Sequence, residues 1–455
     1  MPFPIAFQGK LGRVPYALWS LAVFLSQHLI TLIAFKLLGQ PLPLDWHFIP
    51  LPMRSFVIQS IASDAILLAA FAYVLLVAWV LAALSFRRAA DADVSGWLAT
   101  FAIAPIIQIP VMASLCLLPP RPAGRLAPSS RDASRTIWRA AIEGVVAGLG
   151  LTLSAVALST LIFGSYGYGV FVVAPFVVGA ATAYFANREK DLGASQTARL
   201  VLIAIQTGGI ALLMTSLEGM ICIITAAPLG IGMAHIGGLL GRSIARYSRP
   251  SVLQTFSGFG LLPLVFALEA AMPATTRFDT VASVEVDAPA GTVWSSVLRM
   301  DAIDAPPSLA ARLGVAFPLG WEMIGAGVGA SRLGVFSTGT AVERVTEWAP
   351  ERKLSFVVLR DVPAMRELSP YEHVHAPHVI GYFQTISTSF ELLDQGNGRT
   401  QLVVRTSHDL KLEPIFYWLP LARWVIRQNN DRVLMQIKLQ SERNHSIGGN
   451  PAVRR

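Results

Sequence analysis

Long apolar runs dominate the first 272 residues of the chain. Residues 1–272 contain 17 basic and 10 acidic residues, whereas residues 273–455 contain 19 basic and 18 acidic residues. A helix needs about 20 apolar residues to cross roughly 30 Å of hydrocarbon, and several runs in the charge-poor part reach that length. Soluble helices of this length keep a polar outer face, which these runs lack. The sequence therefore predicts a multi-pass membrane unit followed by a soluble domain.

Eight apolar segments are expected before residue 272. The stretch Ala198–Gly241 is too long for one crossing at about 1.5 Å per residue, so it should fold back at Thr215–Gly219. The remaining expected segments are Tyr16–Leu38, Ala65–Phe86, Trp97–Leu118, Ala141–Phe163, Tyr168–Ala186 and Ser251–Ala271. The apolar run after Arg13 is longer than the apolar core of a signal peptide, about 7–15 residues. We therefore interpret it as the first helix.

Basic residues in alternate loops predict the orientation of the helices. Loop arginines and lysines stay on the cytoplasmic side, and they gather after residues 86, 120, 187 and 241, whereas the turns near Gly164–Gly167 and Ser216–Gly219 have none. This pattern places the last basic loop inside and the C-terminal domain outside the cytoplasm. We therefore expect a multi-pass membrane protein with an extracytoplasmic C-terminal domain.

The segment Trp97–Leu118 conflicts with a simple crossing, because the loops on both of its sides are basic. Pro105 and Pro110 interrupt it, and each removes a helical hydrogen bond. Broken helices are tolerated at membrane depth when they are buried in protein. A re-entrant segment would leave both basic loops on one side, so we predict that these residues enter the membrane and return.

Two short motifs in the first third resemble a family of small bacterial inner-membrane proteins. The first is Phe7–Tyr16, FQGKLGRVPY, and the second is Arg87–Asp91 followed by Ser95–Trp97. Both resemble the domain-of-unknown-function family 805, which usually has arginine at Lys10 and leucine and histidine at positions 89 and 90. The resemblance covers about residues 5–120 and implies a membrane location without a known activity. From the residues alone, Arg13, Arg87 and Arg88 suit contacts with anionic headgroups; a catalytic group of Arg88, Asp91 and Asp93 is the alternative.

The apolar segments hold few ionisable residues, which argues against a transporter. Glu143 and Glu269 fall near segment ends, and Glu218 falls in a turn that water should reach. His235 is the deep ionisable group, and packing between helices is the simpler interpretation for it. A charged group at mid-bilayer costs about 2.5–3.5 kcal/mol on insertion scales, so a proton path would need several deep acids. The small-residue spacings Gly144–Gly148 and Gly237–Gly241 indicate close helix packing.

Residues 276–444 show the alternation of a mixed α+β domain. Along Thr280–Asp287 apolar and polar residues alternate, which is typical of a half-buried strand. Pro289 then suits the first turn of a helix, and Asp394–Gly398 suits a hairpin turn. A long amphipathic helix is expected over Ile415–Arg443. Further strands are expected at Arg332–Ser337, Gly339–Trp348, Lys353–Arg360, Tyr382–Leu392 and Thr400–His408.

This order of elements resembles the helix-grip fold of the SRPBCC superfamily, which contains START lipid carriers and polyketide cyclase-like proteins. The residues that carry it are Val284–Pro289 with Val293 and Trp294, Gly398–Leu402, and Arg432–Leu434. The resemblance implies a sheet that curls around the long helix and encloses an apolar cavity for a ligand. The predicted division is therefore 1–120 and 121–272 for the membrane unit, 276–444 for the helix-grip domain and 445–455 for a flexible tail.

Several polar side chains of this domain are candidates for ligand binding. His373, His375 and His378 lie within six positions, and His408 follows in a later strand. A zinc site would need three or four converging ligands, and histidines also serve as general acids or bases; a polar surface loop is the simpler interpretation. No metal or cofactor is expected. Arg332 and Arg360 could bind an acidic ligand group, although lone arginines in strands are more typically solvated. The full set of ligand-binding candidates is Arg332, Arg360, His373, His375, His378, Tyr382 and His408.

Three classes of function follow from these features. The favoured one is a membrane-tethered domain that binds a lipid or another hydrophobic small molecule, with membrane lipids and that ligand as its partners. A cyclase or dehydratase acting on a polyketide-like substrate is the alternative, and a transporter component comes third. The net charge of +8 and the pI near 9.7 reflect the loop arginines, so no nucleic-acid partner is expected. The sequence sets no oligomeric state.

Overall fold

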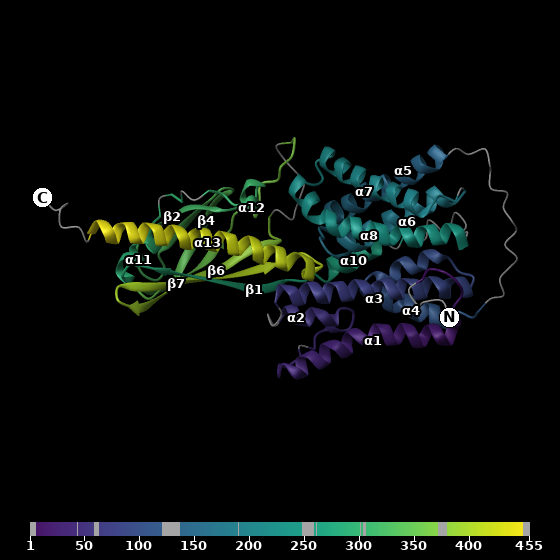
Figure 1. Ribbon diagram of the computed structural model, residues 1–455, viewed down its shortest axis with the longest axis horizontal. Coiled ribbons are helices and arrows are strands. Elements are labelled where there is room, and N and C mark those ends of the chain that lie inside the picture. Colours follow the sequence, from purple (N-terminus) through teal and green to yellow (C-terminus); the bar gives the residue numbers. More distant parts are fainter. Residues whose placement is uncertain are drawn as a thin grey trace. The chain divides into compact units, whose positions relative to one another are not determined.

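The computed structural model divides the chain into two compact units. It describes residues 6–42, 44–58, 63–120, 137–189, 191–247, 259–260, 262–300, 302–303, 306–371 and 380–448. The first unit contains Met1–Ala274, Ser369–Ala376 and Glu413–Tyr417. The second contains Thr275–Leu368, Pro377–Leu412 and Trp418–Arg455. The first is built from apolar helices and the second around one sheet (Figure 1).

Among the described residues of the first unit, six helices are long and apolar enough to cross a membrane. They run side by side in Figure 1, and the fold-back at residues 215–219 is confirmed because α7 ends and α8 begins on either side of it. Their bounds are α1 (Arg13–Leu37), α3 (Asp64–Asp91), α5 (Ile137–Ala157) with its π-helical extension η4 (Leu158–Phe163), η5 (Gly169–Val173) with α6 (Ala174–Asn187), α7 (Ala194–Met214) and α8 (Met220–Tyr247).

The two remaining apolar segments contain shorter elements. Trp97–Leu118 is not one helix: it consists of the 3-10 helix η3 (Gly96–Ile103) and the helix α4 (Gln108–Leu117), separated at Pro105. The described part of Ser251–Ala271 includes α10 (Leu262–Ala271), and residues 251–258 and 261 lie outside the described residues. The link between α1 and α3 contains η1 (Trp46–Phe48), η2 (Pro52–Arg54) and α2 (Ser55–Ile58).

Glycines bring α6 and α8 into backbone contact. A Cβ built on Gly237 would overlap the carbonyl group of Phe176, and one on Gly241 would overlap that of Ala180. Any larger residue would therefore push these two helices apart. The predicted packing role of the Gly237–Gly241 spacing is confirmed, since small residues allow such close approach of membrane helices.

A seven-stranded antiparallel sheet in the order β1-β7-β6-β5-β4-β3-β2 forms the second unit. The predicted strands are all present, and β2 is an additional strand that the sequence did not reveal because Pro318 and Gly320 interrupt its pattern. The predicted hairpin is also present, with Asn397 and Gly398 both at positive φ, as a two-residue turn between twisted strands requires. The bounds are β1 (Thr276–Val286), β2 (Pro318–Ile324), β3 (Ser331–Phe336), β4 (Gly339–Ala349), β5 (Lys353–Arg360), β6 (Phe383–Gly396) and β7 (Arg399–Leu410).

The long helix α13 (Ile415–Gly448) lies along one face of the curled sheet (Figure 1). Leu434 and Ile437 of this helix pack into a buried apolar cluster with Phe356, Phe390 and Leu402 of the sheet. The helix α11 (Ala290–Leu298) contributes to the same cluster, and α12 (Leu309–Arg312) precedes β2. A sheet that curls around one long terminal helix is the helix-grip arrangement, as predicted.

Candidate functional site

One face of the sheet carries both the apolar core and a set of buried polar side chains. The strand register places Thr280, Thr406, Thr388, Phe356 and Val345 in one row across β1, β7, β6, β5 and β4. Side chains two positions apart in a strand share a face. The row therefore fixes which residues face α13 and which face away from it.

Four polar side chains meet at the β1–β7 end of this row, and we call them the His408 cluster: Thr280, Thr406, His408 and Asn430. The two threonine hydroxyl oxygens are 2.7 Å apart. The Nε2 atom of His408 is 2.9 Å from the hydroxyl oxygen of Thr406, and the Asn430 amide donates to Thr280 at 3.2 Å and to Thr406 at 3.4 Å. All four residues are buried.

The imidazole of His408 lies between two aromatic rings. Its ring centre is 5.4 Å from that of Phe278 and 5.1 Å from that of Phe383. Burial lowers the pKa of His408 to about 4, although the nearby carboxylates of Asp279 and Asp409 act to raise it. The ring is therefore neutral at pH 7. Its Nδ1 atom is buried without a hydrogen-bond partner, so this nitrogen is free to bond a polar group brought in by a ligand.

A buried ion pair lies on the same face. Arg332 of β3 and Glu343 of β4 are register partners, and a guanidinium nitrogen donates to the carboxylate. The guanidinium also lies 5.0 Å from the ring centre of Trp321 and 4.4 Å from that of Phe356. Burial raises the pKa of Glu343, whereas the charge of Arg332 lowers it. This contact disfavours the predicted binding of an acidic ligand group by Arg332, because Glu343 already compensates the charge of the guanidinium.

Asp361 interacts both with a neighbour of His408 and with the Arg332–Glu343 ion pair. One of its carboxylate oxygens accepts a bond of 2.6 Å from the backbone N–H of Thr385, which is the register partner of His408. Its charge also acts to raise the pKa of Glu343, and burial raises the pKa of Asp361 itself. His408 and Glu343 each lie two positions beyond the threonine row. The face of the sheet is thus polar at this end and apolar around Phe390 and Leu402.

The other predicted ligand residues lie elsewhere or outside the described residues. Arg360 is exposed at the end of β5. Tyr382 is half-buried just before β6, and burial raises its pKa. His373, His375 and His378 fall outside the described residues, so the predicted histidine group stays a prediction. Among the residues that the structure describes, no three His, Cys, Asp or Glu side chains converge as a metal site would require.

The sequence reasoning found His408 but missed its partners. Thr280 and Thr406 continue the apolar faces of β1 and β7, and a threonine in such a position was a signal that a polar contact lies in the interior. Asn430 and Glu343 gave no comparable signal. The contacts of Asn430 and Glu343 depend on the strand register and on the position of the long helix, which the sequence pattern does not give.

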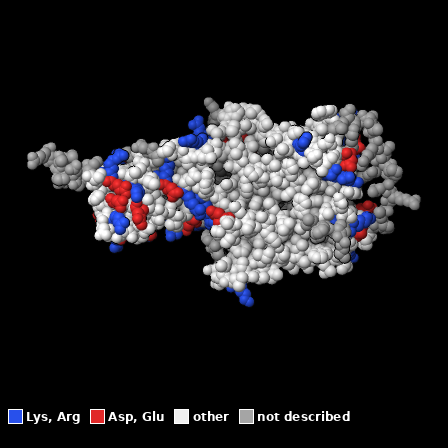
Figure 2. Space-filling model, viewed as in Figure 1, with Lys and Arg blue, Asp and Glu red and all other residues white. Residues whose placement is uncertain are grey.

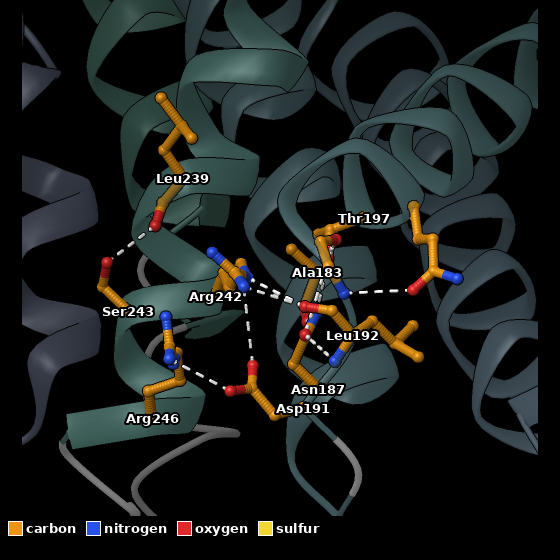
Figure 3. Close-up of polar contacts among 11 residues, drawn as sticks. Ala183, Asn187, Asp191, Leu192, Thr197, Leu239, Arg242, Ser243 and Arg246 are labelled. Carbon is orange, nitrogen blue, oxygen red and sulfur yellow. Dashed lines mark hydrogen bonds and ion pairs between the residues drawn. The ribbon is translucent and has the colours of Figure 1, made fainter.

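The first unit carries most of its described arginines at one end, which we call the arginine end. There Arg242 and Arg246 of α8 contact the loop between α6 and α7 (Figure 3). Arg242 donates at 2.8 Å to the backbone oxygen of Leu192, and Arg246 pairs with Asp191 at 3.0 Å. Figure 2 shows charged side chains gathered at that end of the helices, and the helical surface beside it is almost uncharged.

Arg13 and Arg88, one from each of the two N-terminal motifs, bind the C-terminal end of α4 at this same arginine end. Arg13 donates at 2.6 Å to the backbone oxygen of Cys116, and Arg88 donates at 3.0 Å to that of Leu115. Carbonyls in the last turn of a helix lack partners within it, and cations stabilise them. Arg88 also pairs with Asp91. The arrangement explains the signature as a structural clamp, and it places both ends of residues 92–118 beside the C-terminus of α3.

Different polar contacts occupy the opposite end of the helices. Glu269 of α10 accepts a bond of 2.8 Å from the backbone N–H of Gly169. Glu218 accepts one of 2.7 Å from the hydroxyl of Tyr166, and it is buried, so the prediction that water reaches it was wrong. His235 contacts its own helix through the Ile231 backbone oxygen at 2.8 Å. These acids therefore have separate local partners.

Comparison with known proteins gives separate similarities for the two parts of the chain. Residues 4–125 match the family described as "Protein of unknown function (DUF805)". No curated protein matches the chain.

Solved structures resemble the second unit. The Zhui aromatase/cyclase from Streptomyces is 19% identical with a TM-score of 0.26, and the match covers 38% of this chain and 99% of that one. A norcoclaurine synthase from Thalictrum flavum is 16% identical with a TM-score of 0.22, over 38% and 98% of the chains. An uncharacterised protein from Rhizobium leguminosarum is 11% identical with a TM-score of 0.24, over 38% and 99%. The chain combines membrane-type helices, of which the N-terminal part is similar to a family of unknown function, with a domain whose curled sheet and long terminal helix form the helix-grip arrangement.

Proposed function

We propose that the chain is a membrane-tethered binding protein whose helix-grip domain takes up a hydrophobic small molecule or lipid. The observation that carries this proposal is the buried, neutral imidazole of His408, whose Nδ1 has no partner and which shares a face with an apolar core. Ligand sites of this kind combine apolar walls with a few polar groups that fix orientation. The ligand then has an apolar body and one polar group that bonds to Nδ1.

The polar group of the ligand should be uncharged. A carboxylate or phosphate would need a compensating cation when it leaves water, and the buried cation on this face, Arg332, is already paired with Glu343. A hydroxyl or carbonyl group needs only a hydrogen bond. Alcohols, ketones, esters and sterol-like molecules fit this requirement better than fatty acids do.

Binding is favoured over catalysis by the protonation state of His408. A general base works best when its pKa lies near the operating pH, whereas burial lowers the pKa of His408 to about 4. Such an imidazole is a weak base at neutral pH and a good neutral hydrogen-bonding group. The cyclase-like alternative would require another acid–base group on this face.

The arrangement of the first unit supports a proposal for the side of the membrane on which the second unit lies. The chain reaches the arginine end at the end of α8, and Glu269 lies at the opposite end beside Gly169. Tyr247 and Glu269 therefore lie at opposite ends of the first unit, and Glu269 is the one that lies shortly before the second unit in the sequence. Because arginine-rich ends face the cytoplasm, we propose that the helix-grip domain lies outside it, on a bacterial inner membrane.

Membrane lipids are the proposed partners of the outer helix faces. Large apolar side chains of α1 are exposed, among them Leu18, Leu21, Leu25 and Leu29. Exposed apolar area of this kind is stable when hydrocarbon chains cover it.

Purification of the full-length protein in lipid nanodiscs should yield a bound hydrophobic molecule that mass spectrometry can identify. We expect a compound with an uncharged polar group, enriched over nanodiscs without protein. His408→Leu should lower its occupancy about tenfold, because one buried hydrogen bond is lost. Arg360→Gln is the matched control, since Arg360 is exposed, and it should leave occupancy unchanged. Equal occupancy in wild type and His408→Leu, or no enriched compound, would contradict the proposal.

A pair of C-terminal fusions should report the side of the membrane. Alkaline phosphatase fused after residue 455 should be active, because the enzyme matures only outside the cytoplasm, and green fluorescent protein at the same position should stay dark. The same reporters placed after Tyr247 should give the reverse result. A fluorescent fusion after residue 455 would place the domain in the cytoplasm and overturn this part of the proposal, without touching ligand binding.

A further inference from the structure

Two segments that do not form long helices meet in the interior of the first unit. Residues 92–118 leave the C-terminus of α3 and return to it, since Arg88 holds the end of α4. The link between α1 and α3 approaches from the other ends of these helices. The side chain of Gln108 donates to the backbone oxygen of Pro50 at 3.4 Å. Irregular backbone at membrane depth is tolerated where it is buried in protein or lines a cavity.

The turn of the returning segment is strained. Ile106 has a φ of 69°, which is a rare conformation for a β-branched residue. It lies between Pro105 and the start of α4, where the chain reverses its direction. Strain of this kind persists only when the surroundings impose it, and it concentrates at functional sites.

A cavity lies beside this turn. It offers about 30 Å³ to water-sized molecules, and one water needs about 10–15 Å³ on this measure. Gln27, Gln108 and Tyr168 provide its polar lining, and Pro50, Pro105 and Phe71 are among the apolar lining residues. Its lining extends from Gln27, near the middle of α1, to Tyr168, which precedes Gly169 at the end of the helices opposite to the arginines. The described residues that line it include no carboxylate, amine, guanidinium or imidazole.

One polar group in this lining lacks a partner. The side chain of Tyr168 is 6% exposed, and its hydroxyl has no hydrogen-bond partner. A buried hydroxyl without a partner destabilises the folded state, because it has lost its bonds to water. By contrast, the buried hydroxyl of Tyr16 lies 3.1 Å from the hydroxyl oxygen of Ser85.

We propose that this cavity is a binding site for one or two water molecules, bonded to the Tyr168 hydroxyl and the Gln27 and Gln108 side chains. The described lining residues themselves carry no charge, so they favour a neutral molecule over an ion, which would need an opposite charge in direct contact. Water supplies both donors and acceptors, so it matches a phenol hydroxyl and two amides. The bound water joins the two non-spanning segments to the neighbouring helices through one polar centre.

Thermal unfolding of the full-length protein in nanodiscs tests the proposal through the direction in which one substitution changes the melting temperature. Tyr168→Phe should lower the melting temperature, because it removes a bond to the bound water. If the cavity were dry, the same change would remove an unpartnered hydroxyl and raise the melting temperature, which would overturn the proposal. Tyr16→Phe is the matched control and should lower it in either case, since it breaks a bond to Ser85.

Radiolytic hydroxyl-radical labelling in water enriched in oxygen-18 gives a second readout that does not depend on a variant. Radicals formed from bound water label the side chains next to it, so Tyr168 should be labelled although it is buried. Tyr16 is also buried and should stay unlabelled. Absence of label on Tyr168 at doses that label exposed residues of the helix-grip domain such as Trp424 would overturn the proposal.

Discussion

Replacing Glu343 with leucine while Arg332 remains should lower the free energy of unfolding of the helix-grip domain by about 3–5 kcal/mol. Both side chains are almost completely buried, so the variant leaves a guanidinium without its counter-charge in an apolar interior. Hydrogen exchange of the β3 and β4 peptides in the full-length protein, followed through a urea titration, measures the change. This is the largest effect that we expect from one substitution in this domain.

The double variant Arg332→Met with Glu343→Leu separates the cost of the unpaired charge from general damage to the core. Replacing a complete buried pair with apolar residues is often neutral or stabilising, so the double variant should be more stable than Glu343→Leu alone. An exposed pair provides the control: Lys353 lies 2.9 Å from Glu347, and Glu347→Gln should have little effect because solvent screens that pair. A double variant as unstable as the sum of both single variants would contradict this interpretation.

Acidification should destabilise the same domain through His408. Its pKa is about 4 in the folded protein and about 6.5 in an unfolded chain, so the unfolded state binds more protons between these values. The stability that His408 contributes is therefore complete above pH 6.5 and is lost as the pH falls toward 4. From pH 7 to pH 5 we expect a loss of about 2 kcal/mol in the free energy of unfolding.

The variant His408→Phe should remove the loss of stability that protonation of His408 causes. Phenylalanine can occupy the space between Phe278 and Phe383, and it does not titrate. Hydrogen exchange of β7 peptides at pH 7 and pH 5 provides the measurement. His445→Gln in α13 is the matched control because that side chain is exposed, and it should keep the wild-type pH dependence. If His408→Phe lost as much stability on acidification as the wild type, protonation of His408 would not be the cause.

Local patterns in the sequence were enough to predict most of the fold. Six long helices follow from uninterrupted apolar runs, because nothing except a membrane or a large core can cover them. The alternation along Thr280–Asp287 and the turn at Asn397 and Gly398 located β1 and the β6–β7 hairpin. The strand β2 was missed because Pro318 and Gly320 break its alternation, and only its pairing with β3 makes it a strand.

The candidate site was far less accessible to such reasoning. His408 could be chosen from its residue type, but Thr406, Thr280 and Asn430 come from two strands and a helix that are distant in the chain. Arg332 was interpreted as more typical of a solvated side chain, and the structure instead buries it against Glu343 and Trp321. Register decides these contacts, because a shift by one residue would turn every side chain to the other face.

The sequence by itself determined that this protein has a charge-poor, membrane-type part and a charged, mixed α+β part, because hydrophobicity and periodicity are properties of neighbouring residues. It also showed Arg13 and Arg88 within two family-like motifs, but it did not indicate their structural role. Only the tertiary structure decided that Arg13 and Arg88 hold the end of α4, that Glu343 neutralises Arg332, and that His408 stays neutral. Each of these outcomes depends on which groups exclude water from one another, and that depends on contacts between residues far apart in the chain.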